Sequence, residues 1–126
     1  MTFDFFKFYL LANKLEKYDD EAYLRTAISR YYYALFSLAR LYLIENENQL
    51  FLKRKSSKVH QDIINYFQWS NDETEQNLGK ILYNLRKFRN IADYNWDIKY
   101  DFFKENLDLI KDDVENAKDV LNYLNN

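Results

Sequence analysis

The sequence predicts an all-α fold, an up-and-down antiparallel bundle of four to five helices, through its length, its composition and its periodicity. The chain has 126 residues, enough for one domain with a buried core. It contains one Gly and no Pro, so it lacks the residues that tight turns between strands require. Hydrophobic residues make up 48% of the chain and recur at the spacing of a helix. We therefore expect a single helical domain over residues 1–126.

Five helical segments can be drawn along the chain, with short polar stretches between them. They cover residues 3–17, 20–45, 57–69, 73–94 and 98–124. Side chains that can accept hydrogen bonds from the first amides of a helix stand near four of the expected starts: Asp19 or Asp20, Ser56 or Ser57, Asn71 or Asp72, and Asp97. The stretch between the second and third segments is expected to be a loop that ends in Lys53, Arg54 and Lys55.

The fourth segment, 73–94, carries an apolar stripe with charge inside it. At about 100° per residue, its apolar side chains fall within one arc: Leu78, Ile81, Leu82, Leu85, Phe88 and Ala92. Arg89 falls inside the same arc, and Arg86 and Asp93 lie at its edge. Because an unpaired charge is costly to bury, Arg89 must be paired or must face a cleft.

Polar groups also face inward on two other segments. His60 projects among the apolar residues of the third segment: Val59, Ile63, Ile64, Tyr66 and Phe67. The second segment is apolar around most of its circumference, with a core face of Ile28, Tyr32, Leu35, Ala39, Tyr42 and Leu43. Its remaining strip consists of Thr26, Ser29, Arg30, Tyr33, Ser37 and Arg40. These groups form either an internal hydrogen-bond network, such as Arg89 with Asp93, or a cleft that binds phosphate or RNA.

Composition excludes several kinds of protein. The absence of Cys excludes disulfides and thiolate metal sites, and a single His argues against an all-protein zinc site. No apolar run approaches the ~18 residues of a membrane span, and the N-terminal stretch lacks the features of a signal peptide, so we expect a cytoplasmic protein. Residues 53–94 carry a net charge of +3, too weak for a protein that coats DNA but sufficient for one phosphate site.

Three motifs in order along the chain resemble those of the HEPN superfamily. They are Ser29-Arg30-x-Tyr32-Tyr33-Ala34 in the second segment, Lys58-x-His60 at the start of the third, and Arg89-x-x-Ala92-Asp93-Tyr94 at the end of the fourth. Together they cover roughly residues 20–97. They are similar to the group related to the toxins of HEPN/nucleotidyltransferase toxin–antitoxin systems.

The resemblance implies a helical bundle that often dimerises. In many HEPN proteins an arginine, followed a few residues later by a histidine, lies in a cleft near the dimer axis and cleaves RNA without a metal ion, so no cofactor is expected. Arg89 matches that arginine, whereas the chain has Tyr94 five residues further on and no His after it. The implied setting is a toxin–antitoxin or phage-defence system with a small nucleotidyltransferase as partner.

These residues define a candidate catalytic site. Cleavage of RNA by internal transfer needs a base, an acid and positive charge at the phosphorus. Arg89 would supply the charge, and His60 would transfer protons because its ordinary pKa lies near neutrality. Asp93 would act as a base or orient an arginine, and Tyr94 would donate a hydrogen bond. The residues expected to bind substrate are Ser29, Arg30, Tyr33, Arg86 and Lys58.

Three functions remain open at this point. The first is a HEPN toxin-like ribonuclease or an RNA-binding relative. The second is a catalytically inactive interaction module whose groove binds a nucleotidyltransferase partner or a nucleotide. The third, a purely structural bundle, is disfavoured because three helices place polar groups at core positions. We also expect a homodimer, because the second segment is apolar nearly all round and Trp69 and Trp96 are expected to be exposed.

Overall fold

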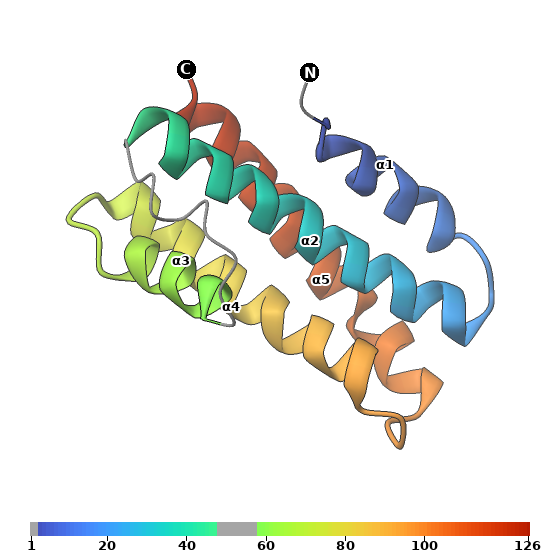
Figure 1. Cartoon of the computed structure of the whole chain (residues 1–126). Helices are drawn as coiled ribbons and strands as arrows, with labels where there is room; N and C mark the ends of the chain where they lie inside the picture. Colours follow the sequence, from blue (N-terminus) through green and yellow to red (C-terminus); the bar gives the residue numbers. More distant parts are fainter. Residues whose placement is uncertain (1–2, 48–57) are drawn as a thin grey trace.

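Five α-helices make up the computed structural model of the chain, which describes residues 3–47 and 58–126 (Figure 1). They are α1 (Phe6–Leu15), α2 (Glu21–Asn46), α3 (Val59–Gln68), α4 (Glu73–Tyr94) and α5 (Tyr100–Leu124). The described residues contain no strand. The all-α bundle predicted from sequence is confirmed, and each expected helix is present with ends that differ by only a few residues.

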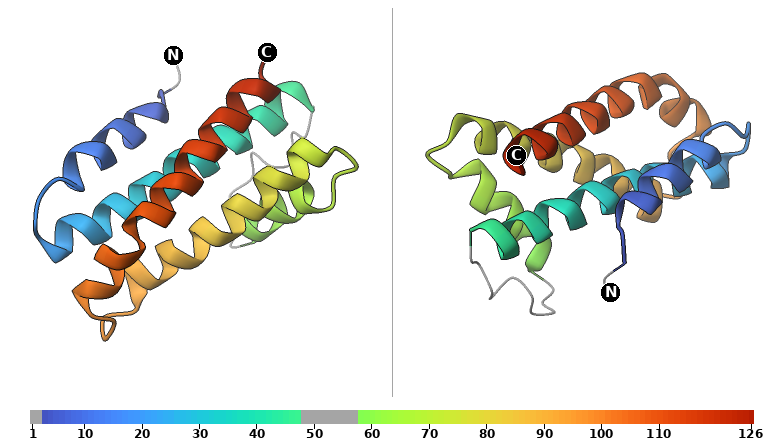
Figure 2. Two further views of the ribbon diagram at one scale, coloured as in Figure 1. Left: turned by 180° about the vertical axis from the view of Figure 1, so that it is seen from behind. Right: turned by 90° about the horizontal axis from the view of Figure 1, so that it is seen from above.

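The second helix, α2, is the centre of the bundle and packs against each of the other four helices. In the views of Figures 1 and 2, α1 and α4 run opposite to α2 and α5, and the short α3 lies beside α4. The predicted antiparallel packing of α2 and α4 is therefore confirmed. This arrangement brings Ser29 of α2 to Asp93 at the end of α4.

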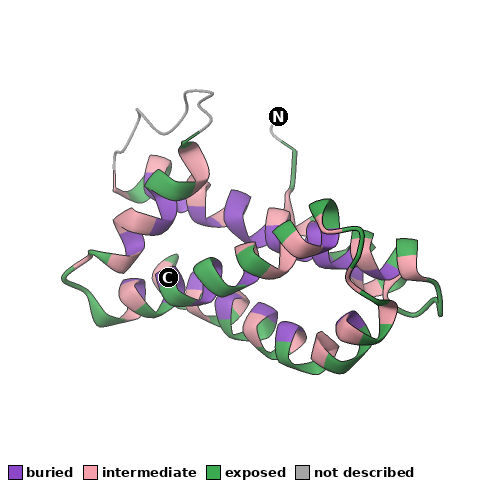
Figure 3. Cartoon of the chain, turned by 90° about the horizontal axis from the view of Figure 1, so that it is seen from below, coloured by how far each residue is buried: buried purple, intermediate pink, exposed green. Residues whose placement is uncertain are grey.

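The core lies between the inward faces of the helices, where the buried residues gather (Figure 3). All six residues of the predicted α2 core face are buried, as are Leu78, Leu82 and Leu85 of α4. Phe88 is partly buried against the same core. None of the helices in the described ranges is long and apolar enough to cross a membrane.

The helix starts confirm two of the predicted caps and correct a third. Asp20 accepts hydrogen bonds from the amides of Ala22 and Tyr23, and Asp72 caps α4 in the same way. The prediction for Asp97 is wrong, because the N-cap position of α5 is Lys99 and no side chain caps the helix. An acceptor must occupy the N-cap position itself to reach the first amides, and Asp97 lies too early in the turn.

The predictions for the loop before α3 fall outside the described residues. They concern Lys53, Arg54 and Lys55 and the capping serines Ser56 and Ser57. The N-cap position of α3 is Lys58, whose side chain does not cap the helix.

The single Gly of the chain allows α3 and α4 to approach closely. A Cβ atom at Gly79 would lie 2.6 Å from the backbone nitrogen of Gln68, at the end of α3. A real Cβ atom cannot lie so close to another heavy atom. Gly79 therefore allows the short distance between α3 and α4. The docking of α3 in turn places His60, in its first turn, beside α2.

Candidate functional site

An ion pair on α4 forms the first part of the candidate site. Nη1 of Arg89 lies 3.9 Å from Oδ2 of Asp93, one helical turn along. The Arg89 side chain is only 15% exposed and that of Asp93 is 29% exposed. Ser29 of α2 donates its hydroxyl hydrogen to the same Asp93 oxygen at 3.1 Å. The pairing of an inward-facing Arg89 with Asp93 therefore exists and is tied to α2.

Tyr32 links this ion pair to the only His of the chain. The guanidinium of Arg89 lies 5.2 Å from the centre of the Tyr32 ring. The Tyr32 hydroxyl is 2.8 Å from Nδ1 of His60. A hydrogen bond therefore joins the Tyr32 hydroxyl of α2 to the His60 imidazole of α3.

We refer to Ser29, Tyr32, His60, Arg89 and Asp93 as the Arg89 cluster. Burial lowers the pKa of His60 to about 4, and the guanidinium groups of Arg89, Arg86 and Arg40 lower it as well. The expectation of a pKa near neutrality for His60 is therefore corrected. His60 is uncharged near neutral pH and is a weak base there.

Burial also controls the Tyr32 hydroxyl. It raises the pKa of Tyr32 to about 12, against the opposing effect of Arg86 and Arg89. Tyr32 therefore keeps its hydrogen near neutral pH. The imidazole of His60 is further held by the ring of Phe36, whose centroid lies 4.1 Å away at an interplanar angle of 17°.

Arg86 and Tyr94 complete the polar surroundings of Arg89. Nη1 of Arg86 donates to Oε1 of Gln61 at 3.2 Å, while its Nε is buried and has no hydrogen-bond partner within the described part of the chain. Nη1 of Arg89 lies 3.4 Å from the hydroxyl of Tyr94. The Tyr94 side chain is exposed, so it stands where the cluster meets solvent.

Three predicted substrate-binding residues lie elsewhere. The guanidinium of Arg30 lies over the rings of Phe8 and Tyr33, 5.1 and 4.9 Å from their centroids. Arg30 and Tyr33 therefore belong to an aromatic group shared with the N-terminal helix, and Tyr33 also lines a pocket to which His60 contributes. Lys58 is exposed at the start of α3, two residues before His60.

Arg25 supports the site, a role that was not predicted from the sequence. Its guanidinium donates to four backbone carbonyls at 2.9–3.3 Å, those of Ile91, Ala92, Asn95 and Ile98. The last carbonyls of a helix lack partners within the helix, so Arg25 anchors the end of α4 that carries Asp93 and Tyr94. The only signal in the sequence is that Arg25 lies one turn before Ser29 on the same helix. Tyr32 was named in the sequence only as a core and motif residue.

A pocket of about 480 Å³ adjoins the cluster through His60, and we name it the His60 pocket. It lies between the start of the chain, α2 and the first turn of α3. Its lining residues are Phe5, Tyr33, Phe36, Ser37, Arg40, Leu41, Ile44, Val59 and His60. Most of the lining is aromatic and aliphatic carbon. Ser37, Arg40 and His60 contribute the polar groups.

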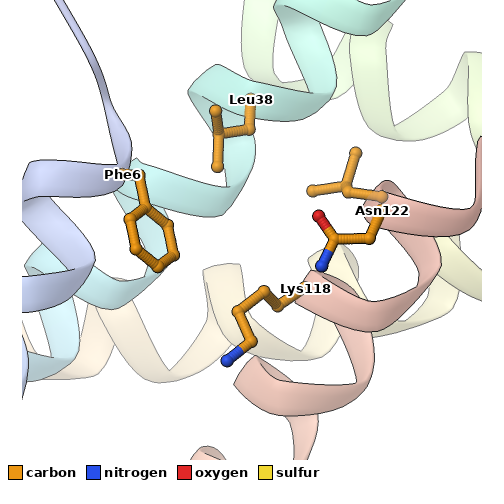
Figure 4. A pocket seen from close by; sticks show the side chains of 5 residues that line it. Phe6, Leu38, Lys118 and Asn122 are labelled. Atoms are coloured by element: carbon orange, nitrogen blue, oxygen red, sulfur yellow. The ribbon is translucent and has the colours of Figure 1, made fainter. Parts of the chain in front are cut away.

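Another pocket, of about 430 Å³, lies between α1, α2 and α5 and shares no residue with the cluster. In Figure 4 Phe6, Leu38 and Lys118 surround it from three different helices. The Lys118 ammonium is engaged by Glu115 at 2.8 Å and by the Tyr9 hydroxyl at 3.3 Å. The lining of this pocket is therefore mostly apolar. Its cation, the Lys118 ammonium, is already bound to Glu115 and Tyr9.

The donor set of the site is not that of a metal centre. Within residues 3–47 and 58–126, no group of three or more His, Cys, Asp or Glu side chains is placed to hold a metal ion. The Arg89 cluster brings one carboxylate together with arginine, hydroxyl and neutral imidazole groups. Such a set suits the binding of an anion rather than a cation.

Comparison with known proteins gives one relative for this chain. Uncharacterized protein MJ0992 of Methanocaldococcus jannaschii is 31% identical over 117 residues, with 81% of this chain and 66% of that protein covered. This chain thus spans just under two thirds of that relative's length. No family model matches the chain. No solved structure matches it either.

Proposed function

We propose that this chain is a HEPN toxin-like protein that acts on RNA, as a metal-independent ribonuclease or an RNA-binding relative, in the cytoplasm of a prokaryote with a toxin–antitoxin or phage-defence system. One observation carries the proposal: the Arg89 side chain is only 15% exposed, and its guanidinium lies 3.9 Å from Asp93 and 5.2 Å from the centre of the Tyr32 ring. A guanidinium is a planar donor that matches the geometry of a phosphate. Fixing it beside exposed Tyr94 suits a phosphate that arrives from solvent.

The structure modifies the roles expected for the acid–base groups. A neutral His60 that shares a hydrogen bond with Tyr32 is a weak proton acceptor. In a cleavage reaction the base for the ribose 2′-hydroxyl would then be Asp93, whose side chain is 29% exposed. Arg89, with Arg86 nearby, would stabilise the charge on the phosphorus.

The proposal is tested by incubating the purified chain with unpaired RNA in the presence of EDTA. Arg89→Gln should abolish cleavage, or RNA binding if the protein only binds. A matched control is Lys80→Gln, which removes an exposed positive charge from the same helix and should leave activity unchanged. Equal activity of the Arg89→Gln variant and the wild type would contradict the proposal.

A second candidate is a catalytically inactive module that binds a nucleotidyltransferase partner or a nucleotide. The observation in its favour is that Tyr94 stands where a catalytic His is expected and that the pKa of His60 is about 4. Retained RNA or nucleotide binding with no cleavage product under any condition tested would favour this module. Mixing the chain with a nucleotidyltransferase encoded beside it tests the partner directly.

Either function is compatible with a homodimer. Trp69 and Trp96 are 77% and 87% exposed, as predicted from the sequence, and large exposed aromatic side chains are typical of interfaces. Trp96 lies two residues after Tyr94, so a partner subunit seated there would adjoin the Arg89 cluster. A monomeric mass by light scattering at tens of micromolar would count against the dimer.

A further inference from the structure

No described helix covers the groove between α4 and α5, which we call the α4–α5 groove. The helices α2, α4 and α5 pack against one another in pairs, so this three-helix core has three grooves on its outside. The short α3 packs against both α2 and α4. The N-terminal α1 packs on α2 and reaches α5 through Glu16, which pairs with Lys111 at 2.7 Å. In the left view of Figure 2, α4 and α5 lie side by side and no described helix passes in front of them.

The α4–α5 groove has an apolar floor. It contains a cavity of about 460 Å³, and its apolar lining comes from both helices: Phe88, Ile91, Phe102 and Leu109. Leu109 is 54% exposed, and the other three are only partly buried against the core. An apolar stripe of this kind is typical of a helix face that packs against another element.

Opposite charges border the groove on its two sides. Lys80 and Lys87 are exposed on the flank of α4 beside the groove. On α5, Glu105, Asp108 and Asp112 are exposed and share one flank at about 100° per residue. An occupant of the groove therefore meets positive charge on one side and negative charge on the other.

Asp113 indicates what the occupant must carry on the side of α5. This residue lines the groove and is partly buried, and it forms no hydrogen bond or ion pair among the described residues. Burial and the neighbouring carboxylate of Asp112 raise the pKa of Asp113. An unpaired carboxylate that is partly desolvated costs stability, so the fold gains nothing from an acid at this position. A Lys or Arg seated in the groove would give it a partner.

The docking of α1 shows how a single helix binds to the other side of α5. It buries Tyr9 and Ala12, and Glu16 supplies the charge opposite to that of Lys111. Because Lys111 and Asp113 are two residues apart on a helix, their side chains point about 160° away from each other. A helix in the α4–α5 groove would repeat the same combination of apolar stripe and opposite charge. The five described helices already pack in the bundle, so a second copy offers none of them singly.

We propose that the α4–α5 groove binds an amphipathic helix of another protein. The apolar stripe of that helix packs on Leu109, and a Lys or Arg on one of its flanks pairs with Asp113. Its other flank carries Asp or Glu and faces Lys87. Helix-in-groove binding of this kind is a common mode of peptide recognition. Lys87 lies two residues before Arg89 and points about 160° away from it, so the inference concerns a surface outside the Arg89 cluster and goes beyond the proposed function.

Three synthetic helical peptides test the inference with the whole chain. The matched peptide has a stripe of Leu, Arg on one flank and Glu on the other. In the acidic peptide every Arg is replaced by Glu, and in the polar peptide every Leu is replaced by Gln. By fluorescence anisotropy the matched peptide should bind, and the other two should bind at least about tenfold more weakly. Equal binding of the three peptides would overturn the inference.

Variants of the chain assign the binding to the groove. Leu109→Glu should weaken binding of the matched peptide at least about tenfold, whereas Leu10→Glu, at an exposed position of α1, should not. Asp113→Asn should weaken the binding and raise the melting temperature, because it removes an unpaired charge. A purely structural Asp113 would give a lower melting temperature with unchanged affinity for the peptide. That result, or unchanged affinity in folded Leu109→Glu, would contradict the proposal.

Light scattering separates a second copy of this chain from a helix of another protein. If the wild type self-associates and Leu109→Glu alone makes it monomeric, a second copy covers the groove and the inference is overturned. Arg89→Gln should bind the matched peptide as the wild type does, because Arg89 lies on the other side of α4. Failure of the groove and failure of the proposed action on RNA are therefore distinguishable.

Discussion

The hydroxyl oxygen of Tyr32 lies 2.8 Å from Nδ1 of His60, and this contact determines how the only His of the chain is used. Tyr32 keeps its hydrogen because burial raises its pKa to about 12. His60 remains uncharged because burial and three neighbouring arginines hold its pKa at about 4. Neither member of the pair therefore titrates near neutral pH.

We expect NMR titration of the His60 ring to give a pKa of about 4, against an ordinary value near 6.5. Because the folded protein binds this proton less readily than the unfolded chain, the stabilisation from neutral His60 is present above pH ~6.5 and is lost as pH falls toward about 4. Arg89→Gln should raise the pKa by removing a nearby positive charge. A measured pKa of 6.5 or higher in the wild type would contradict the described burial of the ring.

Two glutamates near the C-terminal end of α2, Glu47 and Glu75, form a second pH-sensitive contact. Its contribution to stability should change with pH in the direction opposite to that of His60. The Tyr42 hydroxyl lies 3.0 Å from Oε1 of Glu47 and 2.9 Å from Oε2 of buried Glu75. One hydroxyl hydrogen cannot serve two ionised carboxylates. A hydrogen bond with Glu75, together with burial, accordingly raises the pKa of Glu47. Protonated Glu47 is thus favoured in the folded protein.

Glu47→Gln should increase stability near neutral pH. The stabilisation from protonated Glu47 is fully present below its ordinary pKa of about 4.5 and is lost as pH rises through the raised value in the folded protein. The amide of Gln keeps the donor without the charge. Urea unfolding should show a gain at neutral pH and little change in acid. Glu45→Gln, at an exposed position of the same turn, is the matched control, and an equal gain in that variant would argue against a specific pair.

Arg25→Ala should destabilise the protein by about 2–4 kcal/mol, because the carbonyls at the end of α4 lose a charged donor. The neighbouring ion pair with Glu21 at 2.9 Å contributes little by comparison, since partly exposed pairs are worth about 1 kcal/mol or less. Glu21→Gln is therefore the control, measured beside Arg25→Ala by urea unfolding. Similar losses in the two variants would mean that the carbonyl bonds are not the source of the stability.

Helical period and capping chemistry were enough to predict the fold. The stripe through Leu78, Leu82 and Leu85 located α4 and its buried face, and Asp20 and Asp72 marked two helix starts. The cap of α5 was assigned wrongly to Asp97, because no side chain caps this helix. Just before this helix the Ile98 carbonyl accepts from Arg25, a tertiary bond that no local pattern reveals.

Only part of the candidate site could be predicted from the sequence, because the partners of a side chain depend on tertiary packing. Angular position on α4 showed that Arg89 faces inward and that Asp93 shares its side. The same reasoning placed Tyr32 in the apolar core, because periodicity cannot show what its hydroxyl meets. It also grouped Arg30 with Ser29, although adjacent residues on a helix point about 100° apart. Only the packing of α1 shows that Arg30 turns to the rings of Phe8 and Tyr33.

The central claim is that Arg89 is retained for function rather than for stability. An Arg that precedes Asp by four residues is the weaker orientation for a helical ion pair, so helix stability alone does not explain the pair. Lys in place of Arg keeps the charge but loses the planar, two-pronged donor that binds a phosphate.

The most direct test is therefore to measure, for Arg89→Lys beside the wild type, both the melting temperature and the action on RNA per folded molecule. The account predicts a loss of RNA cleavage or binding of at least about tenfold, with a change in melting temperature of only a few degrees. A sharp fall in melting temperature with unchanged action on RNA per folded molecule would contradict it and would make Arg89 a structural residue.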